Sequence, residues 1–438
     1  MEGWVAGLMF PALFALVVAG VPVAFALMGT SLAFGWLAFG DGIGLQLLNR
    51  LLEIAQSFLF AAVPMFVLMG AVLERSGLAE RLFRALQVPL GRVRGGTALA
   101  AMAMGGIFAA ATGIIGAVEV VIGLMVVPVM LRQGYDKGLI SGTVTAAGSL
   151  GTIIPPSVLC VVYGSVGQLP VTDLFAGCLV PGLLMLALFM GYVWLRCRLD
   201  PAAGPPTPAD ELPPRGDRAR LLLTGLVPPA LLIAAVLGSI LAGIASPTEA
   251  GAVGAAGTIL LAAANRRLGV PGLVEAGRTT LRVTSFVMFV VLGGMMFSSV
   301  FYVHGGRALV QAALEAWPLG PAGAVALMLG IVFAMGFVLD WATIVLVTVP
   351  LFAPAVQGLG VDPLWFAVMA IVTLQTSYLT PPMAPAIFYL RSIAPPEITY
   401  GDMARGVLPF VACQLLTLAL VAAFPGTATW LPRWLAGG

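Results

Sequence analysis

Long uncharged apolar stretches recur along the whole chain, separated by short polar or proline-rich segments. The clearest of them are 54–73, 174–195, 221–248, 283–303 and 363–390. A helix needs about 20 predominantly apolar residues to cross the hydrocarbon of a bilayer. The pattern therefore predicts an all-α polytopic membrane protein.

The composition leads to the same class. Only 9% of the residues are charged and 60% are hydrophobic, with a mean hydropathy of +1.05, whereas about a quarter of a typical soluble domain is charged. The N-terminal apolar run lacks the charged start and the cleavage site of a signal peptide, so we expect it to remain as a membrane helix. The four cysteines stand singly, without pairing or metal-ligand spacing.

The two halves of the chain repeat one another. The segment 148–157, with its Pro155-Pro156 pair, resembles 374–383, with Pro381-Pro382, at a separation of 226 residues. Four more landmarks keep nearly the same offset, of 225, 222, 227 and 228 residues: Pro22 with Pro247, Pro128 with Pro350, Thr172 with Thr399, and Pro181 with Pro409. Five matches in chain order indicate an internal duplication.

We therefore expect a first copy at 1–199, a linker at 200–220 and a second copy at 221–438. The linker is charged and proline-rich. The expected parts of each copy are three initial helices (within 4–73 and 221–303), a polar segment (74–96 and 304–317), a hairpin broken near its middle (97–130 and 318–354), a helix broken at Pro-Pro (138–167 and 363–393) and a last helix (172–195 and 403–424).

The positive charges predict how the copies cross the membrane. If the first hairpin opens to the cytoplasm and the second to the outside, eighteen of the 21 lysines and arginines face the cytoplasm. Only Arg50, Arg307 and Arg433 then face outward, which satisfies the positive-inside rule. This arrangement needs an odd number of crossings per copy, so the second copy is inverted relative to the first. Both termini are then expected outside the cytoplasm.

Matching helix breaks in two halves are a sequence sign of a transporter's binding site. Prolines 155 and 156 remove two donors and free the carbonyls of the preceding turn. Those carbonyls and nearby hydroxyls are hard oxygen ligands for an alkali cation. The alternative is a kink in a packed helix, which is less favoured because the break recurs in both copies.

Asp340 lies in an otherwise uncharged run, 317–361, so we expect it at membrane depth. A carboxylate there is costly and is by default a functional candidate. We expect it to help hold a cation near Thr343, Thr376, Ser377 and Thr380; the alternative is a carboxylate that local hydroxyls satisfy for structure alone. Glu119 in the first hairpin has three open roles: cation ligand, proton carrier or partner of an arginine.

Four segments in this order resemble the large membrane subunit of a tripartite ATP-independent periplasmic (TRAP) transporter, the DctM-like family. They are Arg132-Gln-Gly-Tyr-Asp-Lys-Gly, 147–157, Gly336-Phe-Val-Leu-Asp340 and Leu379-Thr-Pro-Pro. The sequence Ala-Ala-Thr-Gly-Ile-Ile-Gly at the expected tip of the first hairpin is most similar to the branch of the family named for mannitol and chloroaromatic substrates.

The resemblance implies a sodium-driven elevator transporter, with an ion-transporter-superfamily-like fold, in the bacterial inner membrane. It implies three partners besides lipid: a small membrane subunit (Q), a soluble periplasmic substrate-binding protein (P) and a small organic acid as substrate. The hairpins and broken helices would form the moving transport domain. The polar segments would be arms that join it to a scaffold. No nucleic acid partner is expected.

The resemblance also implies two sodium sites and a substrate site between the hairpin tips and the Pro-Pro breaks. The first sodium site would use Thr112, Gly113, Ser149, Gly151 and Thr152, and the second Asp340, Thr343, Thr376, Ser377 and Thr380. The substrate would lie near Thr112, Gly113, Pro155, Pro156, Ser157, Thr380, Pro381 and Pro382. No arginine falls in a tip or a break, so the N-terminal ends of half-helices would face the substrate carboxylate.

Two rival functions remain. A self-sufficient ion-coupled symporter of the same fold would need no partner proteins. An intramembrane enzyme would need a Ser-Lys dyad, paired aspartates or zinc ligands. The only lysine is Lys137, in an expected cytoplasmic loop, and no metal-ligand cluster is present in the sequence. We therefore expect no enzymatic activity and no catalytic residues.

Overall fold

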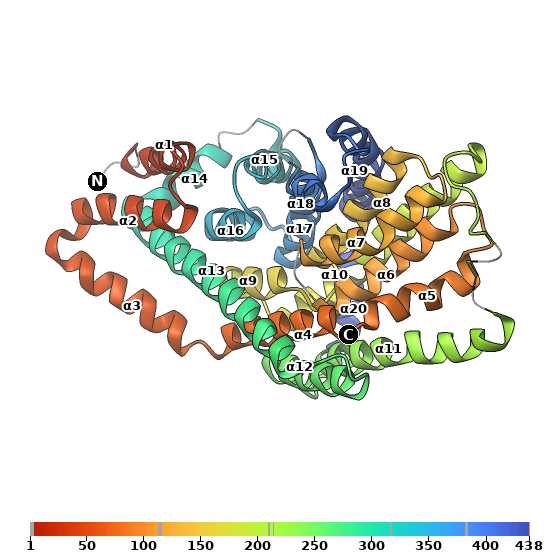
Figure 1. The fold of residues 1–438 in the computed structure, drawn as a ribbon. Helices are drawn as coiled ribbons and strands as arrows, with labels where there is room; N and C mark the ends of the chain where they lie inside the picture. The colour runs from red at the N-terminus through yellow and green to blue at the C-terminus, as the bar shows by residue number, and fades with distance from the viewer. Residues whose placement is uncertain are drawn as a thin grey trace.

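The computed structural model describes residues 4–112, 116–208, 211–212, 214–315, 318–381 and 384–437, and this part of the chain is built from helices and turns (Figure 1). The first half holds α1 Trp4–Val18, α2 Val23–Phe39, α3 Ile43–Gln56, α4 Ala62–Arg75, α5 Leu78–Leu90, α6 Gly96–Thr112, α7 Ala117–Arg132, α8 Lys137–Ser149, α9 Val158–Gly167 and α10 Val171–Leu199. The second half holds α11 Arg218–Leu241, α12 Pro247–Ala264, α13 Val270–Val303, α14 Gly306–Glu315, α15 Gly320–Met335, α16 Trp341–Gly358, α17 Pro363–Leu379, α18 Pro385–Ile393, α19 Tyr400–Ala423 and α20 Gly426–Leu435.

Seven helical stretches in the described part of the chain are long and apolar enough to cross a membrane. They are Val23–Gln56, Phe58–Arg75, Val171–Leu199, Arg218–Leu241, Val270–Val303, Trp341–Gly358 and Tyr400–Ala423. The all-helical, membrane-type architecture expected from the sequence is confirmed.

Four pairs of short helices flank the expected hairpin tips and Pro-Pro breaks, and one of these helices, α16, is also among the seven candidate spans. Helix α6 ends at Thr112 and α7 begins at Ala117, directly after Gly116, whose φ of +84° suits glycine. Helices α15 and α16 are separated by the turn 336–340. Helices α8 and α9 are separated by a 3-10 turn, Leu150–Thr152, and by Pro155-Pro156, while α17 ends at Leu379 and α18 begins at Pro385. Each of these helices has fewer than 20 residues.

Contacts between the two halves of the chain come in matching pairs. Helix α2 packs on α13, and α4 packs on α12; α8 packs on α19, and α17 packs on α10. The same holds for α9 with α16 and α18 with α7, and for α1 with α14 and α11 with α5. Two equivalent units related by an approximate twofold axis produce this pattern. Helices of each half therefore pack against helices of the other half.

Three helices differ from the sequence expectation. Helix α13 begins at residue 270 rather than near 283, and α3 and α20 were not expected at all. The repeat offset places α3 opposite the first half of α13, so one continuous helix in the second half corresponds to α3 and α4 in the first. Ser57, with extended backbone (ψ 108°), separates α3 from that next helix. Helix α3 and the first half of α13 contain charged residues, so a search for long uncharged stretches does not find them.

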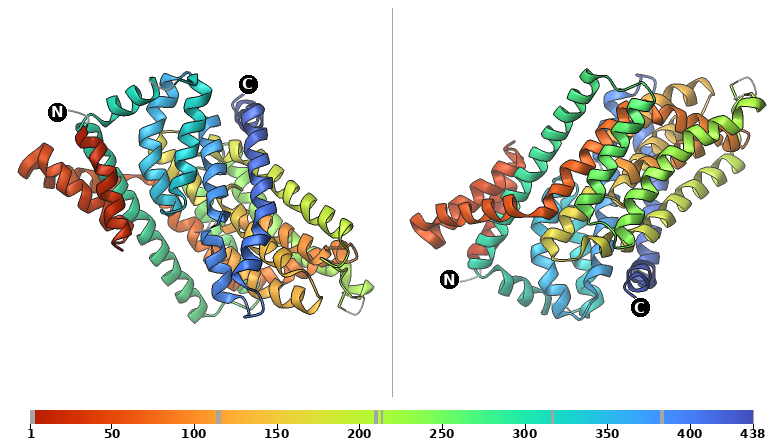
Figure 2. Two further views of the ribbon diagram at one scale, coloured as in Figure 1. Left: turned by 90° about the horizontal axis from the view of Figure 1, so that it is seen from above. Right: turned by 90° about the horizontal axis from the view of Figure 1, so that it is seen from below.

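Figure 1 shows α13 running obliquely from the end of the molecule near α2 and α14 to α12. In both views of Figure 2 the first helices, coloured red to orange, lie at one edge of the molecule. Helices α6–α9 and α15–α18 lie on the other side of α13, where α16 contacts α13 directly. Residues of α13 therefore face both groups of helices.

Glycines allow α8 and α19 to approach closely. A Cβ atom on Gly142 would lie 2.2 Å from the Gly406 carbonyl oxygen, and one on Gly406 would lie 2.1 Å from the Gly138 carbonyl oxygen. Membrane helices pack through small residues at such contacts because lipid provides no hydrophobic drive for association.

We expect Gly406→Ala to lower the free energy of unfolding by about 1–3 kcal/mol, since the added methyl group must push two backbones apart. Thermal unfolding of the detergent-purified protein measures the loss. Gly330→Ala in α15 is the matched control, because no atom lies within 4 Å of the added Cβ. An equal response of the two variants would contradict this packing.

Candidate functional site

The broken helices α8 and α17 meet at a pair of equivalent residues. The Gln375 amide nitrogen donates to the Ser149 hydroxyl at 3.1 Å, and both residues are completely buried. They are 226 residues apart, which is the repeat offset of the double prolines. The two copies therefore touch at the site itself. Gln375 was missed from the sequence, although the offset from Ser149 could have found it.

Hydroxyl groups satisfy the backbone at the break between α8 and α9. The Ser157 hydroxyl donates to the Thr152 carbonyl at 2.8 Å, and the Thr152 hydroxyl donates to the Ser149 carbonyl at 2.8 Å. The Ser149 hydroxyl in turn donates to the Ala146 carbonyl at 2.8 Å. One buried turn thus brings together Ser149, Gly151, Thr152, Pro155, Pro156 and Ser157.

Three residues expected at the sodium or substrate sites are not described in full. Gly113 and Pro382 lie outside the described residues, and so does the side chain of Thr112. The first expected cation site is consequently described only on its α8 side.

Asp340 caps the N-terminus of α16. One carboxylate oxygen accepts from the backbone N–H groups of Ala342 (2.9 Å) and Thr343 (3.1 Å), and the other accepts from the Thr343 hydroxyl at 2.6 Å. This arrangement supplies the structural role that we kept as the alternative. It leaves the cation role open, because the oxygen that accepts from the Thr343 hydroxyl has a second lone pair for a further ligand.

A cavity of about 180 Å³ opens beside Asp340. Ser377, Tyr378 and Tyr389 also line it. Gly336 lies against Ser377, since a Cβ atom on this glycine would be 1.9 Å from the serine hydroxyl. The structure therefore brings Asp340 and Ser377 to one cavity, and the two tyrosines are lining residues that the sequence did not reveal.

Thr376 and Thr380 lie on the neighbouring turns but do not line this cavity. Their hydroxyls donate to carbonyls of their own helix, those of Val372 (2.8 Å) and Thr376 (2.7 Å) respectively. Ser377 does the same to the Leu374 carbonyl at 2.7 Å. Each hydroxyl oxygen keeps lone pairs toward a cation, while its proton is used locally. Pro381 follows in the turn beyond α17.

Glu119 is a fully buried carboxylate in the first turn of α7. Neither of its oxygens has a hydrogen bond of normal geometry among the described residues, although the Tyr378 hydroxyl interacts with it. Its side chain lies against Gly148 of α8: a Cβ atom there would be 1.9 Å from the Glu119 Cγ. The ring of Tyr389 covers Gly116, one turn earlier, at 2.9 Å from the equivalent built Cβ.

Of the three roles left open for Glu119, pairing with an arginine has no support in the described residues, because no ion pair involves this carboxylate. A buried charged carboxylate without a counter-ion is strongly disfavoured. Glu119 therefore needs either a bound cation or a bound proton, and those two roles remain.

We expect Gly148→Ala to destabilise the protein by about 1–3 kcal/mol, because the new methyl group overlaps Glu119. In a Glu119→Ala background, where the overlapping side chain is gone, Gly148→Ala should cost much less stability than it does in the wild-type protein. Thermal unfolding of all four proteins gives the coupling directly. Additive effects would show that the two residues do not touch.

Paired short helices, broken helices that meet between two repeated halves, and a carboxylate at the start of α16 are the arrangement of a membrane transporter. The chain belongs to the DctM family, the DctM component of tripartite ATP-independent periplasmic transporters, whose family model matches residues 10–427. This is a family of transporter permeases. The mannitol and chloroaromatic branch is not identified among the relatives named below.

Relatives cover nearly the whole chain. It is 30% identical over 413 residues to the C4-dicarboxylate TRAP transporter large permease protein DctM of Pseudomonas aeruginosa, covering 93% of this chain and 94% of that one. It is 30% identical to the ectoine/5-hydroxyectoine large permease UehC of Ruegeria pomeroyi (93% of both chains) and 28% identical to the sialic acid large permease SiaM of Vibrio cholerae (99% and 98%). The crystal structure of the Alcanivorax borkumensis YdaH transporter has the same fold, with a TM-score of 0.67 at 17% identity over 95% of this chain and 98% of that one.

Proposed function

We propose that this chain is the large permease subunit of a sodium-coupled TRAP transporter that imports a small organic acid across the bacterial inner membrane. The observation that carries the proposal is the meeting of the two copies at Ser149 and Gln375, with Asp340 and Glu119 on the adjoining hairpins. A site between inverted repeats can be reached from either side when one group of helices moves against the other.

The proposed moving unit is α6–α9 with α15–α18, and the proposed scaffold is α1–α4 with α11–α13. Helices α5 and α14 would be the arms between them. Both termini would then lie on the periplasmic side. The proposed partners are a small membrane subunit and a periplasmic substrate-binding protein, as the family's tripartite name implies. Relatives named for C4-dicarboxylate and sialic acid support an organic acid as substrate.

The donor set around Asp340 fits Na⁺, which prefers hard oxygen ligands. Asp340 and Ser377 supply carboxylate and hydroxyl oxygens at the cavity, and the Thr343 hydroxyl bonds to Asp340. Thr376 and Thr380 lie close to Ser377 in the chain but do not line the cavity. The other proposed ion site, the first of the two expected from the sequence, uses Ser149, Gly151 and Thr152, together with Thr112 and Gly113. The substrate would bind between these sites, at the two Pro-Pro breaks. Bound cations would lower the cost of bringing an anion to this depth.

The test is uptake into liposomes that contain this chain, its small subunit and its binding protein. We expect uptake of an organic acid only with all three proteins and an inward sodium gradient. Uptake by this chain alone would instead support the self-sufficient symporter. Uptake that follows a proton gradient without sodium would overturn sodium coupling and assign the coupling role to Glu119.

Asp340→Asn distinguishes the two roles of this side chain, because it removes the negative charge and keeps the helix cap. Asparagine caps helices about as well as aspartate, so the variant should unfold at nearly the wild-type temperature, whereas Asp340→Ala should lose about 1 kcal/mol of stability. We expect both to abolish sodium-driven uptake, because both remove the charge.

Asp362→Asn is the matched control for this variant. Asp362 caps α17 with the same two backbone hydrogen bonds, to Leu364 and Trp365, but it does not line the Asp340 cavity. Its variant should transport normally. Full sodium-dependent uptake by Asp340→Asn would contradict the cation role.

A further inference from the structure

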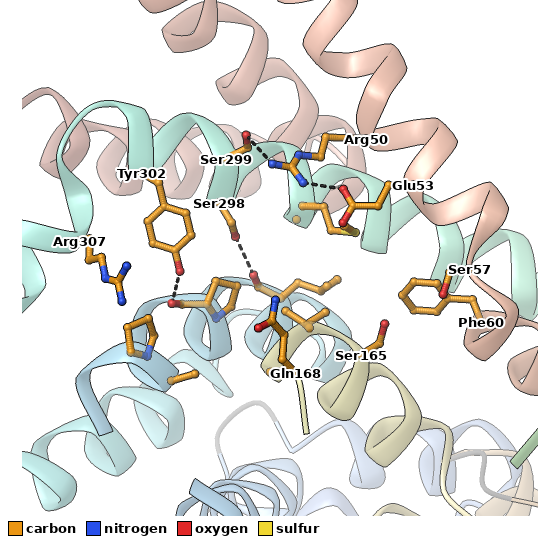
Figure 3. A pocket seen from close by; sticks show the side chains of 18 of the residues that line it. Arg50, Glu53, Ser57, Phe60, Ser165, Gln168, Ser298, Ser299, Tyr302 and Arg307 are labelled. Atoms are coloured by element: carbon orange, nitrogen blue, oxygen red, sulfur yellow. Dashed lines mark hydrogen bonds and ion pairs between the residues drawn. The ribbon is translucent and has the colours of Figure 1, made fainter. Parts of the chain in front are cut away.

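A second, larger cavity of about 660 Å³ lies away from the site described above and shares no lining residue with the Asp340 cavity (Figure 3). One wall comes from α3, α13 and α14, and the facing wall comes from α16 and the end of α9. Its volume falls in the range of small-molecule binding sites.

The charges in this cavity do not cancel. Arg50 pairs with Glu53 at 2.5 Å and also donates to the Ser299 hydroxyl at 3.3 Å. Arg307 is a lining residue that forms no ion pair with any described carboxylate. Figure 3 shows it beside Tyr302 at one end of the cavity. Two guanidinium groups and one carboxylate leave one positive charge, held at Arg307.

The other polar groups of the lining are uncharged. Figure 3 shows the Ser57, Ser165 and Gln168 side chains on the side of the cavity away from Arg307, and Gln357 lines it as well. Hydroxyl and amide groups of this kind bind the hydroxyl or amide substituents of a ligand. A guanidinium group binds a carboxylate through two parallel hydrogen bonds.

We propose that this cavity is a binding site for a small monocarboxylate with polar substituents, with Arg307 as the residue that holds the carboxylate. A single excess positive charge matches one ligand carboxylate, and a second ligand carboxylate would approach the negatively charged Glu53. The inference rests on the proposed function, since it gives the imported acid a second binding site besides the one between the hairpins. Because the walls belong to α13–α14 and to α9–α16, a ligand here contacts both groups of helices.

The test measures binding alone, without partner proteins or a gradient, so its failure is distinct from a failure of transport. Gln357, an exposed lining residue, is replaced by cysteine in a background whose four native cysteines are alanine. The rate of maleimide labelling is then measured with gluconate, with the dianion glucarate and with uncharged sorbitol. We expect gluconate to protect the thiol, glucarate to protect it less and sorbitol not at all.

Arg307→Gln should weaken protection by gluconate by about tenfold to a hundredfold, the usual loss for a hydrogen bond to a charged group. Arg307→Lys should retain part of it. Arg433→Gln, which removes an exposed arginine paired with Asp362, is the control and should change nothing.

Four results would overturn the proposal. They are the absence of protection by gluconate, equal protection by sorbitol, protection that survives Arg307→Gln, and protection by glycerol phosphate that exceeds protection by gluconate. The last result would make the cavity a lipid headgroup site.

Discussion

A helix broken inside a membrane must satisfy its backbone groups without water, and the candidate site is organised around this constraint. Short side chains satisfy it locally. The Ser157 hydroxyl donates to the Thr152 carbonyl across the first break. At the start of α16 the Asp340 carboxylate accepts hydrogen bonds from two backbone N–H groups. At the end of α17 the Thr380 hydroxyl donates to the Thr376 carbonyl. The chain's own side chains therefore satisfy these backbone groups at the breaks. What remains for a ligand is oxygen lone pairs, together with the unpaired carboxylate of Glu119.

The second organising feature is the contact between equivalent parts of the two copies. Ser149 and Gln375 join the broken helices at one buried point, and the surrounding helix contacts occur in matching pairs. The interface between α13 and α16 is of another kind. The Ser298 hydroxyl donates to the Leu346 carbonyl at 3.3 Å, and a Cβ atom on Gly294 would lie 2.5 Å from the Leu346 Cβ. The Tyr302 hydroxyl also donates to the Pro350 carbonyl, so two side-chain hydrogen bonds join the described residues of α13 and α16.

The sequence predicted those elements whose signal is local. The double prolines located both helix breaks, the segment 110–116 located the division between α6 and α7, and the repeat offset paired the breaks. The amphipathic α3 and the first half of α13 were missed because charged residues interrupt the apolar pattern that marks a span. The cap formed by Asp340 was within reach, since Thr343 stands three residues later.

Contacts between distant segments were beyond such reasoning. Glu119 meets Gly148 and Tyr378 from two other helices, and no local pattern reveals this neighbourhood. Arg307 was distinguished only by its predicted side of the membrane. Its cavity is assembled from segments between residues 50 and 357. Packing of the whole chain, rather than any motif, creates these two sites.

We propose that the moving unit, α6–α9 with α15–α18, shifts against α13 during transport. Cysteines at Ser298 and Leu346, in a background whose four native cysteines are alanine, place two thiols across this interface. Mercuric ion would bridge them, and the loss of free thiols would measure completion. We predict that bridging stops uptake, that excess dithiothreitol restores it, and that neither single-cysteine variant responds. Normal uptake by the fully bridged protein would contradict the account.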